Sequence, residues 1–193
     1  MTIPFQCKCG AVRGQVEPRT VHARATCYCR DCQAFARALK REDALDAHGG
    51  TDIVAMLPSG LHFTAGTAQL ACLSLSPKGL LRWYARCCDT PLANTPRDAK
   101  LPYVGILGDC FVPDALDAVV GPSRIALNVK SARGPVQATP VRTVLGVGRI
   151  MRRVLFARLR GRGANPFFVA GTDQPVAEPR VLSKAERMAV TPV

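Results

Sequence analysis

The arrangement of the nine cysteines constrains this chain more than any other feature. All nine precede residue 111, and seven of them fall into three short groups: Cys7-x-Cys9-Gly10, Cys27-x-Cys29-x-x-Cys32 and the pair Cys87-Cys88. Nine in 193 residues is a lower density than that of small disulfide scaffolds, which reach about 8–10%. The grouping therefore favours metal ligands, with buried free thiols and disulfides as the less favoured alternatives.

The first residues and the apolar runs of the sequence predict the cellular location of the protein. Residues 1–10 hold no apolar stretch long enough for a secretory signal. The longest run without Asp, Glu, Lys or Arg, 53–77, is interrupted by Pro58, Gly60 and Gly66, so we expect no membrane span. These features predict a cytoplasmic protein, in which thiols stay reduced and available to a metal.

The cysteine-rich part of the chain is predicted to be mainly β. Residues 69–76 (QLACLSLS) alternate between apolar and polar side chains, and 11–16 and 80–85 have similar patterns. Pro77-Lys78-Gly79 is typical of a hairpin turn between two of these strands. Residues 30–46 are the one helical stretch in this part. We therefore expect an antiparallel core with one short helix.

Positive charge divides the chain into two regions. The net charge of +12 is concentrated in residues 120–193, which hold 13 Lys or Arg and 3 Asp or Glu. A break at Gly121-Pro122 suggests two units: a zinc-binding β domain over 1–120 and an arginine-rich C-terminal extension over 121–193. We expect residues 161–193 to form a loose tail.

Residues 144–159 of the extension predict a basic amphipathic helix. Its apolar stripe would contain Val147, Ile150, Met151, Val154, Leu155 and Leu159. The simplest interpretation is a helix packed on the core with solvated arginines. Self-association, a membrane surface and a nucleic acid are the alternatives.

The middle cysteine group is the candidate catalytic centre. Cys27, Cys29 and Cys32 provide three thiolates within six residues, and a zinc site with three protein ligands leaves a fourth position for water or substrate. Zinc is the expected metal, as one or two ions, and iron is the alternative. The isolated Cys72 and Cys110 are predicted to be buried thiols.

At these residues the sequence resembles the glutathione-dependent formaldehyde-activating enzyme family, which includes centromere protein V. That family has Cys-x-Cys-Gly near its start, Cys-x-Cys-x-x-Cys about twenty residues later, and then a segment like aromatic-Cys-x-x-Cys-Gly-x-Pro-Leu. The matching third stretch here is Tyr-Ala-Arg-Cys-Cys-Asp-Thr-Pro-Leu at 84–92. The resemblance covers residues 5–115.

The resemblance implies a β-tent fold that holds two zinc ions. The structural ion would be bound by Cys7, Cys9 and Cys88. The fourth ligand of the family falls at Ala85, so Cys87, Asp89 or water would have to replace it.

For the second ion, the resemblance implies a carbon–sulfur lyase that adds glutathione to formaldehyde at Cys27, Cys29 and Cys32. Arg24, Arg30 and Arg37 lie near this motif and could hold the carboxylates of glutathione, with exposed, solvated arginines as the more favoured interpretation. The rival function is a non-enzymatic zinc module whose seven arginines over 142–162 bind an acidic partner such as nucleic acid. The three histidines, His22, His48 and His62, are expected to be structural or exposed. The oligomeric state is left open.

Overall fold

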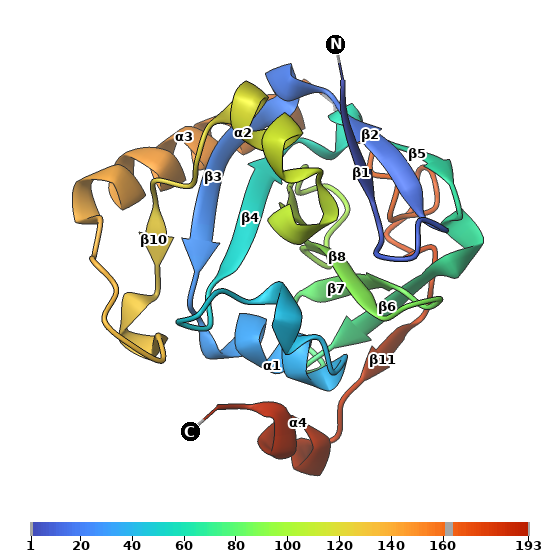
Figure 1. Cartoon of the computed structure of the whole chain (residues 1–193). Helices are drawn as coiled ribbons and strands as arrows, with labels where there is room; N and C mark the ends of the chain where they lie inside the picture. The colour runs from blue at the N-terminus through green and yellow to red at the C-terminus, as the bar shows by residue number, and fades with distance from the viewer. Residues whose placement is uncertain (1, 161–163, 193) are drawn as a thin grey trace.

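The computed structural model describes residues 2–160 and 164–192, and this part of the chain is mainly β, as predicted (Figure 1). A small sheet contains, in order, β1 (Ile3–Gln6), β2 (Arg13–Val16) and β5 (Leu61–Ala65). The large sheet contains, in order, β10 (Ala126–Leu127), β3 (Val21–Cys27), β4 (Thr51–Met56), β9 (Val104–Leu107), β8 (Thr90–Thr95), β7 (Leu81–Ala85), β6 (Leu70–Ser74) and β11 (Pro179–Val181).

The predicted hairpin around residues 77–79 is confirmed. β6 and β7 pair antiparallel with Leu70 opposite Ala85, and the backbone N–H of Gly79 donates to the Ser76 carbonyl at 3.0 Å. All residues of β6 are buried, including Ser74. Strands β7 and β11 lie on either side of β6 in the sheet, and its side chains pack into two separate hydrophobic clusters. The alternating pattern in the sequence correctly predicts a strand here, but it does not show that the polar side chains of this strand are also buried.

The predicted antiparallel core is confirmed for the strands of residues 1–120, whereas two strands from beyond that region pair parallel at the edges of the large sheet. β10 pairs parallel with β3, and β11 pairs parallel with β6. Parallel neighbours need a long connection, and about a hundred residues separate the strands of each pair. Both edge strands come from the C-terminal region, which therefore completes the large sheet on either side.

The helix predicted over 30–46 is shorter than expected, and it is not alone. α1 (Arg30–Ala38) ends early because Lys40 adopts a left-handed backbone with φ of 55°, after which Glu42–Ala44 forms a 3₁₀ turn. A second helix, α2 (Pro113–Val120), follows β9. Eight residues are too few for a reliable periodic pattern, so the sequence reading missed it.

The predicted basic helix is present as α3 (Pro140–Leu159), and it starts four residues before the predicted position. It lies against β3, with Gly146, Val154 and Ala157 buried. A Cβ at Gly146 would lie 2.5 Å from Ile125 Cδ1, so the glycine permits this close approach. The predicted apolar stripe is wrong as a packing face, because Val147, Met151, Leu155 and Leu159 are exposed.

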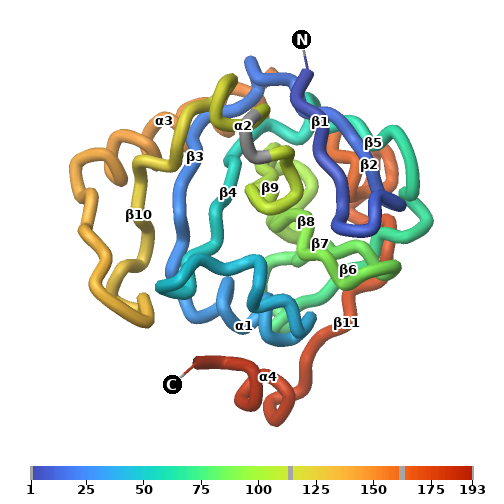
Figure 2. Tube along the Cα trace, viewed as in Figure 1, coloured from blue at the N-terminus to red at the C-terminus, as the bar shows by residue number. Residues whose placement is uncertain are grey.

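The prediction of a loose C-terminal tail is also wrong. Residues 179–181 form β11 beside β6, and α4 (Lys184–Val190) starts with a capping box between Ser183 and Glu186 and packs on α1 (Figure 2). Phe167 is 1% exposed and stacks on Trp83 with ring centroids 4.7 Å apart. Side chains beyond residue 160 thus belong to the main hydrophobic core.

Candidate metal centres

Four sulfur atoms meet where two turns of the chain come together. Cys7 and Cys9 lie in the turn between β1 and β2, and Cys87 and Cys88 lie in the turn between β7 and β8. All four Sγ atoms are within 4.8 Å of one another. Gly10, with φ of 74°, donates its N–H to the Cys7 carbonyl at 2.9 Å and closes the first turn.

The third motif places both of its adjacent cysteines in this cluster. Cys87 Sγ lies 3.3 Å from Cys9 Sγ and 3.8 Å from Cys88 Sγ. Ala85 is fully buried at the end of β7, and Asp89 is not one of the clustered side chains. Of the three candidates for the missing fourth donor, the geometry therefore favours Cys87 over Asp89. Asp89 has a positive φ of 51°, a backbone conformation that favours glycine.

The spacing and chemistry of this cluster suit a tetrahedral zinc ion. Four sulfurs about 2.3 Å from one ion occupy the corners of a tetrahedron with edges of about 3.8 Å. The Sγ–Sγ distances from Cys7 to Cys9 and to Cys87 are 3.6 and 3.8 Å. Four thiols are also a common donor set for structural zinc. We call this group the four-sulfur cluster.

The middle motif forms a second group of three sulfurs, which we call the three-sulfur cluster. Cys27 is the last residue of β3, Cys29 caps the N-terminus of α1 and Cys32 lies in its first turn. Their Sγ atoms are within 4.8 Å of one another, and no fourth Cys, His, Asp or Glu of the described residues joins them. The backbone N–H of Cys32 donates to Cys29 Sγ at 3.3 Å, which orients that sulfur toward the group.

The three thiols of the three-sulfur cluster share protons unequally. Hydrogen bonds from Cys29 and Cys32, with a further one from Asn128, lower the pKa of Cys27 to about 2. Hydrogen bonds with Cys27 and Cys29, together with burial, raise the pKa of Cys32 well above its usual value. The thiolate of Cys27 is therefore stabilised by the two neighbouring thiols, and a cation bound at the cluster would stabilise it further.

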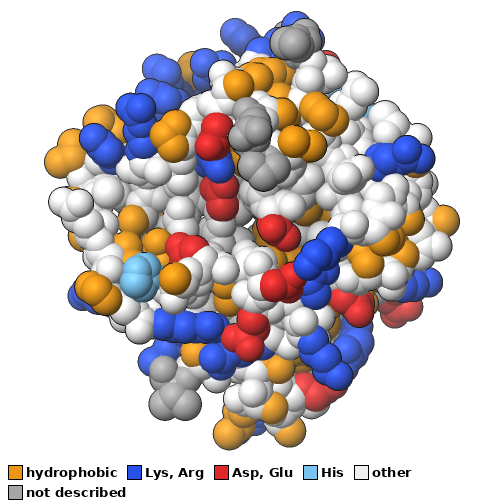
Figure 3. Space-filling view, viewed as in Figure 1, with side chains coloured by type: hydrophobic (Ala, Val, Ile, Leu, Met, Phe, Trp, Pro, Cys, Tyr) orange, Lys and Arg blue, Asp and Glu red, His pale blue; other side chains and the backbone are white. Residues whose placement is uncertain are grey.

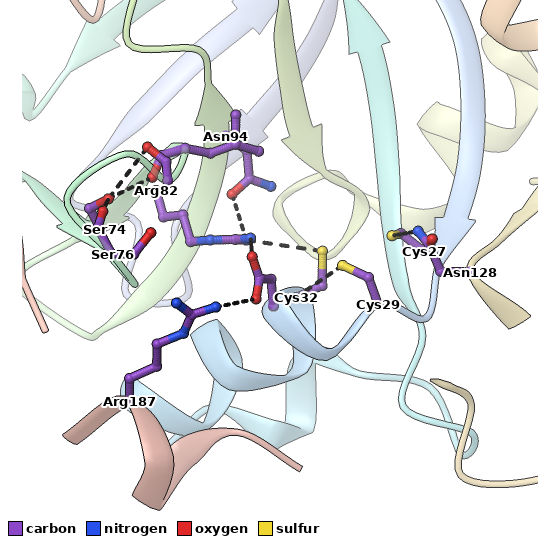
Figure 4. A network of polar contacts seen from close by, with 12 residues as sticks. Cys27, Cys29, Cys32, Ser74, Ser76, Arg82, Asn94, Asn128 and Arg187 are labelled. Carbon is purple, nitrogen blue, oxygen red and sulfur yellow. Dashed lines mark hydrogen bonds and ion pairs between the residues drawn. The ribbon is translucent and has the colours of Figure 1, made fainter. Parts of the chain in front are cut away.

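Two polar side chains that the sequence analysis did not select contact this cluster (Figure 4). Asn128, next to β10, donates from Nδ2 to Cys27 Sγ at 3.4 Å. Arg82 on β7 is 3% exposed, and its Nη1 lies 4.0 Å from Cys32 Sγ and 3.1 Å from Asn94 Oδ1. Of these two contacts, only that of Arg82 could have been suspected from the sequence, because a charged residue at position 82 is unusual within the otherwise apolar or aromatic segment 80–85.

Replacing Arg82 with methionine should weaken zinc binding at the three-sulfur cluster about 10–100-fold, the usual effect of losing an outer-shell partner. The guanidinium beside Cys32 offsets the negative charge of the sulfurs, and Arg82→Lys should retain part of that effect. Competition with a chromogenic chelator measures the affinity.

The matched control for this prediction is Arg97→Met. Arg97 is also partly buried, but it donates to the Gly79 carbonyl and to Ser74 Oγ, at 2.9 and 2.8 Å. An equal loss of affinity in both variants would show that Arg82 acts on general stability and not on the sulfurs.

The arginines selected from the sequence are placed differently. Arg24 donates to Asp52 at 2.8 Å and to the Gly121 carbonyl at 2.7 Å, and Arg37 donates to Glu42 at 3.1 Å. Arg30 is exposed. Two of the three are thus already paired with carboxylates of this chain. Arg82 takes the position beside the sulfurs.

The histidines and the isolated cysteines lie outside both clusters. His22 is buried, and burial lowers its pKa. His62 is exposed, with Nε2 3.6 Å from Glu17 Oε1. No histidine of the described residues joins a group of metal donors. Cys72 and Cys110 are each 2% exposed, which confirms the prediction that they are buried thiols.

Comparison with known proteins places the chain in a family without giving it an activity. A crystal structure of a Rhodobacter sphaeroides protein, a structural genomics target, shares 18% identity over 56% of this chain and 86% of that chain, with a TM-score of 0.40. No curated protein matches the sequence. Within the described residues, every helix is too short or too polar to cross a bilayer. The model of a family of unknown function, DUF6151, matches residues 1–178, and the chain therefore belongs to that family.

Proposed function

We propose that this protein is a zinc enzyme of the carbon–sulfur lyase type, which adds a small thiol to a small aldehyde at the three-sulfur cluster. The observation that carries the proposal is the difference between the two clusters. One has four sulfurs, and the other has three with no fourth donor among the described residues. A complete set of protein ligands is typical of a structural zinc, and an incomplete one is typical of a catalytic zinc.

The resemblance to formaldehyde-activating enzymes suggests glutathione and formaldehyde as the reactants. Zinc bound by Cys27, Cys29 and Cys32 would lower the pKa of a thiol at the open position and supply a thiolate at neutral pH. In the overall reaction, the thiol loses its proton to solvent and a carbon–sulfur bond forms at the aldehyde carbon. The carbonyl oxygen gains a proton, which gives a hydroxymethyl thioether without any oxidant.

The chain contributes charge compensation to this site. Three thiolates and a divalent cation carry one net negative charge, and a substrate thiolate adds a second. The Arg82 guanidinium next to Cys32 and the Asn128 amide next to Cys27 both present N–H groups to the sulfurs. In a buried site such partners reduce the repulsion that an added anion meets.

The test is the exchange of ¹³C-formaldehyde with its glutathione adduct, followed by NMR with the wild-type protein and with Cys29→Ser. Serine is a good helix N-cap, so this change removes a sulfur while it preserves the start of α1. We expect the wild type to accelerate exchange above the spontaneous rate and to contain two zinc ions. Cys29→Ser should show the spontaneous rate and retain one ion.

Cys72→Ala is the control, because Cys72 is buried outside both clusters and its loss should leave exchange unchanged. Acceleration that persists in Cys29→Ser would refute the proposed site. Two zinc ions without any acceleration would favour the rival interpretation, a non-enzymatic zinc module.

A further inference from the structure

The helix α3 has an apolar face that points away from the protein. Val144, Met151, Leu155 and Leu159 are spaced by seven, four and four residues, so they lie on one side of the helix. The exposed fractions of these side chains are 71, 62, 56 and 74%. The opposite side, with Gly146, Val154 and Ala157, contacts the body of the protein. The outward face therefore has no partner among the described residues.

The charged side chains of α3 are all positive. The helix and its C-cap contain six arginines and no acidic residue: Arg142, Arg149, Arg152, Arg153, Arg158 and Arg160. None of the six forms an ion pair with any described residue. The seventh arginine of this run, Arg162, lies outside the described residues. In Figure 3, Lys and Arg side chains lie beside hydrophobic ones at the upper left, where Figure 1 shows α3.

A pocket of about 730 Å³ adjoins the basic side of α3, between that helix and β3. Arg142 and Arg149 of α3 line it together with Arg124, and Leu145 also lines it. His22, which is 6% exposed, lines the same pocket, and its Nε2 has no hydrogen-bond partner among the described residues. Arg24 also lines the pocket but is paired with Asp52 and Asp117. The other three arginines have no ion pair among the described residues, and an anionic group would compensate their charge.

We propose that α3 docks on the surface of an anionic lipid bilayer, with its apolar face among the acyl chains and its arginines at the phosphates. A basic helix with an apolar face binds membranes by lying in the interface, and it need not span them. Arginines near an anionic surface are attracted to it, and this attraction falls off within a Debye length. Two other partners fit these features less well. A second copy of this chain would place its six arginines against those of the first, and like charges repel. A nucleic acid would leave the apolar face exposed to water.

The test is co-sedimentation of the full chain with phosphatidylcholine vesicles, with and without phosphatidylglycerol. We expect binding to the anionic vesicles alone, and release at high salt because screening weakens the arginine–phosphate attraction. Met151→Asp should reduce the partition coefficient at least about tenfold, since it places a charge in the apolar face. The double variant Arg149→Gln and Arg152→Gln should also weaken binding.

Two matched variants keep the result specific. Met188→Asp changes a methionine that is 69% exposed on α4. The double variant Arg13→Gln and Lys78→Gln removes the same amount of charge from two exposed residues elsewhere. Both should bind vesicles as the wild type does. Circular dichroism and the zinc content show that each variant is folded.

Five outcomes would overturn the proposal. These are equal binding to neutral vesicles, absence of binding to either kind, and an equal loss in the matched variants and in Met151→Asp. The fourth is a dimer, detected by analytical ultracentrifugation, that Met151→Asp dissociates, because it would assign the face to a second copy. Retention on duplex DNA in the absence of vesicle binding would equally assign the arginines to nucleic acid.

Discussion

The Cys7→Ala variant should lose one of two zinc ions, and its free energy of unfolding should fall by about 5 kcal/mol or more, because the binding energy of a structural zinc contributes directly to folding. Cys7 belongs to the β1–β2 turn and Cys87 to the β7–β8 turn, so the four-sulfur cluster joins the small sheet to the large one. Urea unfolding with metal analysis before and after the transition measures both quantities. A chelator should lower the stability of the wild type in the same direction.

Cys110→Ala provides the matched comparison. Cys7 and Cys110 are 0 and 2% exposed, so both substitutions remove a buried sulfur from the core, but only Cys7 belongs to a cluster. The cost for Cys110→Ala should stay near the usual core value of about 1–2 kcal/mol, with zinc content unchanged. Similar losses for the two variants would mean that the four-sulfur cluster does not hold a structural metal.

Phe167→Ala should destabilise the protein by about 3–5 kcal/mol, the range for truncating a buried aromatic side chain. Phe167 is 1% exposed, stacks on Trp83 and meets Phe63 edge-to-face with centroids 5.5 Å apart. Thermal and urea unfolding measure the change. Phe167 lies beyond the last cysteine, in the region that the sequence predicted to be a loose tail, so a loss of this size would show that this region stabilises the fold.

Phe156→Ala is the control, because that ring on α3 is 51% exposed. It should change stability by no more than about 0.5 kcal/mol. Deleting residues 161–193 should cost at least as much as Phe167→Ala, since β11 and α4 are lost as well. A shortened chain as stable as the full one would contradict the packing of Phe167 in the core.

The local pattern of the sequence predicts the features whose parts lie close together in the chain. Cys27, Cys29 and Cys32 form one cluster because a strand end and the first helical turn hold them within six residues. The hairpin at 77–79 follows from its turn residues and the flanking alternation. The resemblance added that the first and third motifs meet, and the structure confirms that their sulfurs do.

The features that the sequence reading missed depend on contacts between distant segments. Arg82 reaches Cys32 across 50 residues, and Asn128 reaches Cys27 across 101, so no local period records either contact. The orientation of the apolar side of α3 also depends on contacts between distant segments. A hydrophobic stripe shows that a helix has two faces, but the tertiary fold decides which face is buried. Here Gly146, Val154 and Ala157 lie on the buried side, where Gly146 allows the close approach of Ile125, while the larger Met151 and Leu155 point outward.

The sequence pattern therefore predicted the mainly β class, the clustering of Cys27, Cys29 and Cys32 and the basic helix, because each of these follows from residue type and short spacing. The folded structure was needed to show that Cys87 joins Cys88 in one cluster and that Phe167 completes the core. It also decided that strands from the C-terminal region flank the large sheet. These outcomes depend on which distant surfaces bury each other, and burial is a property of the whole fold.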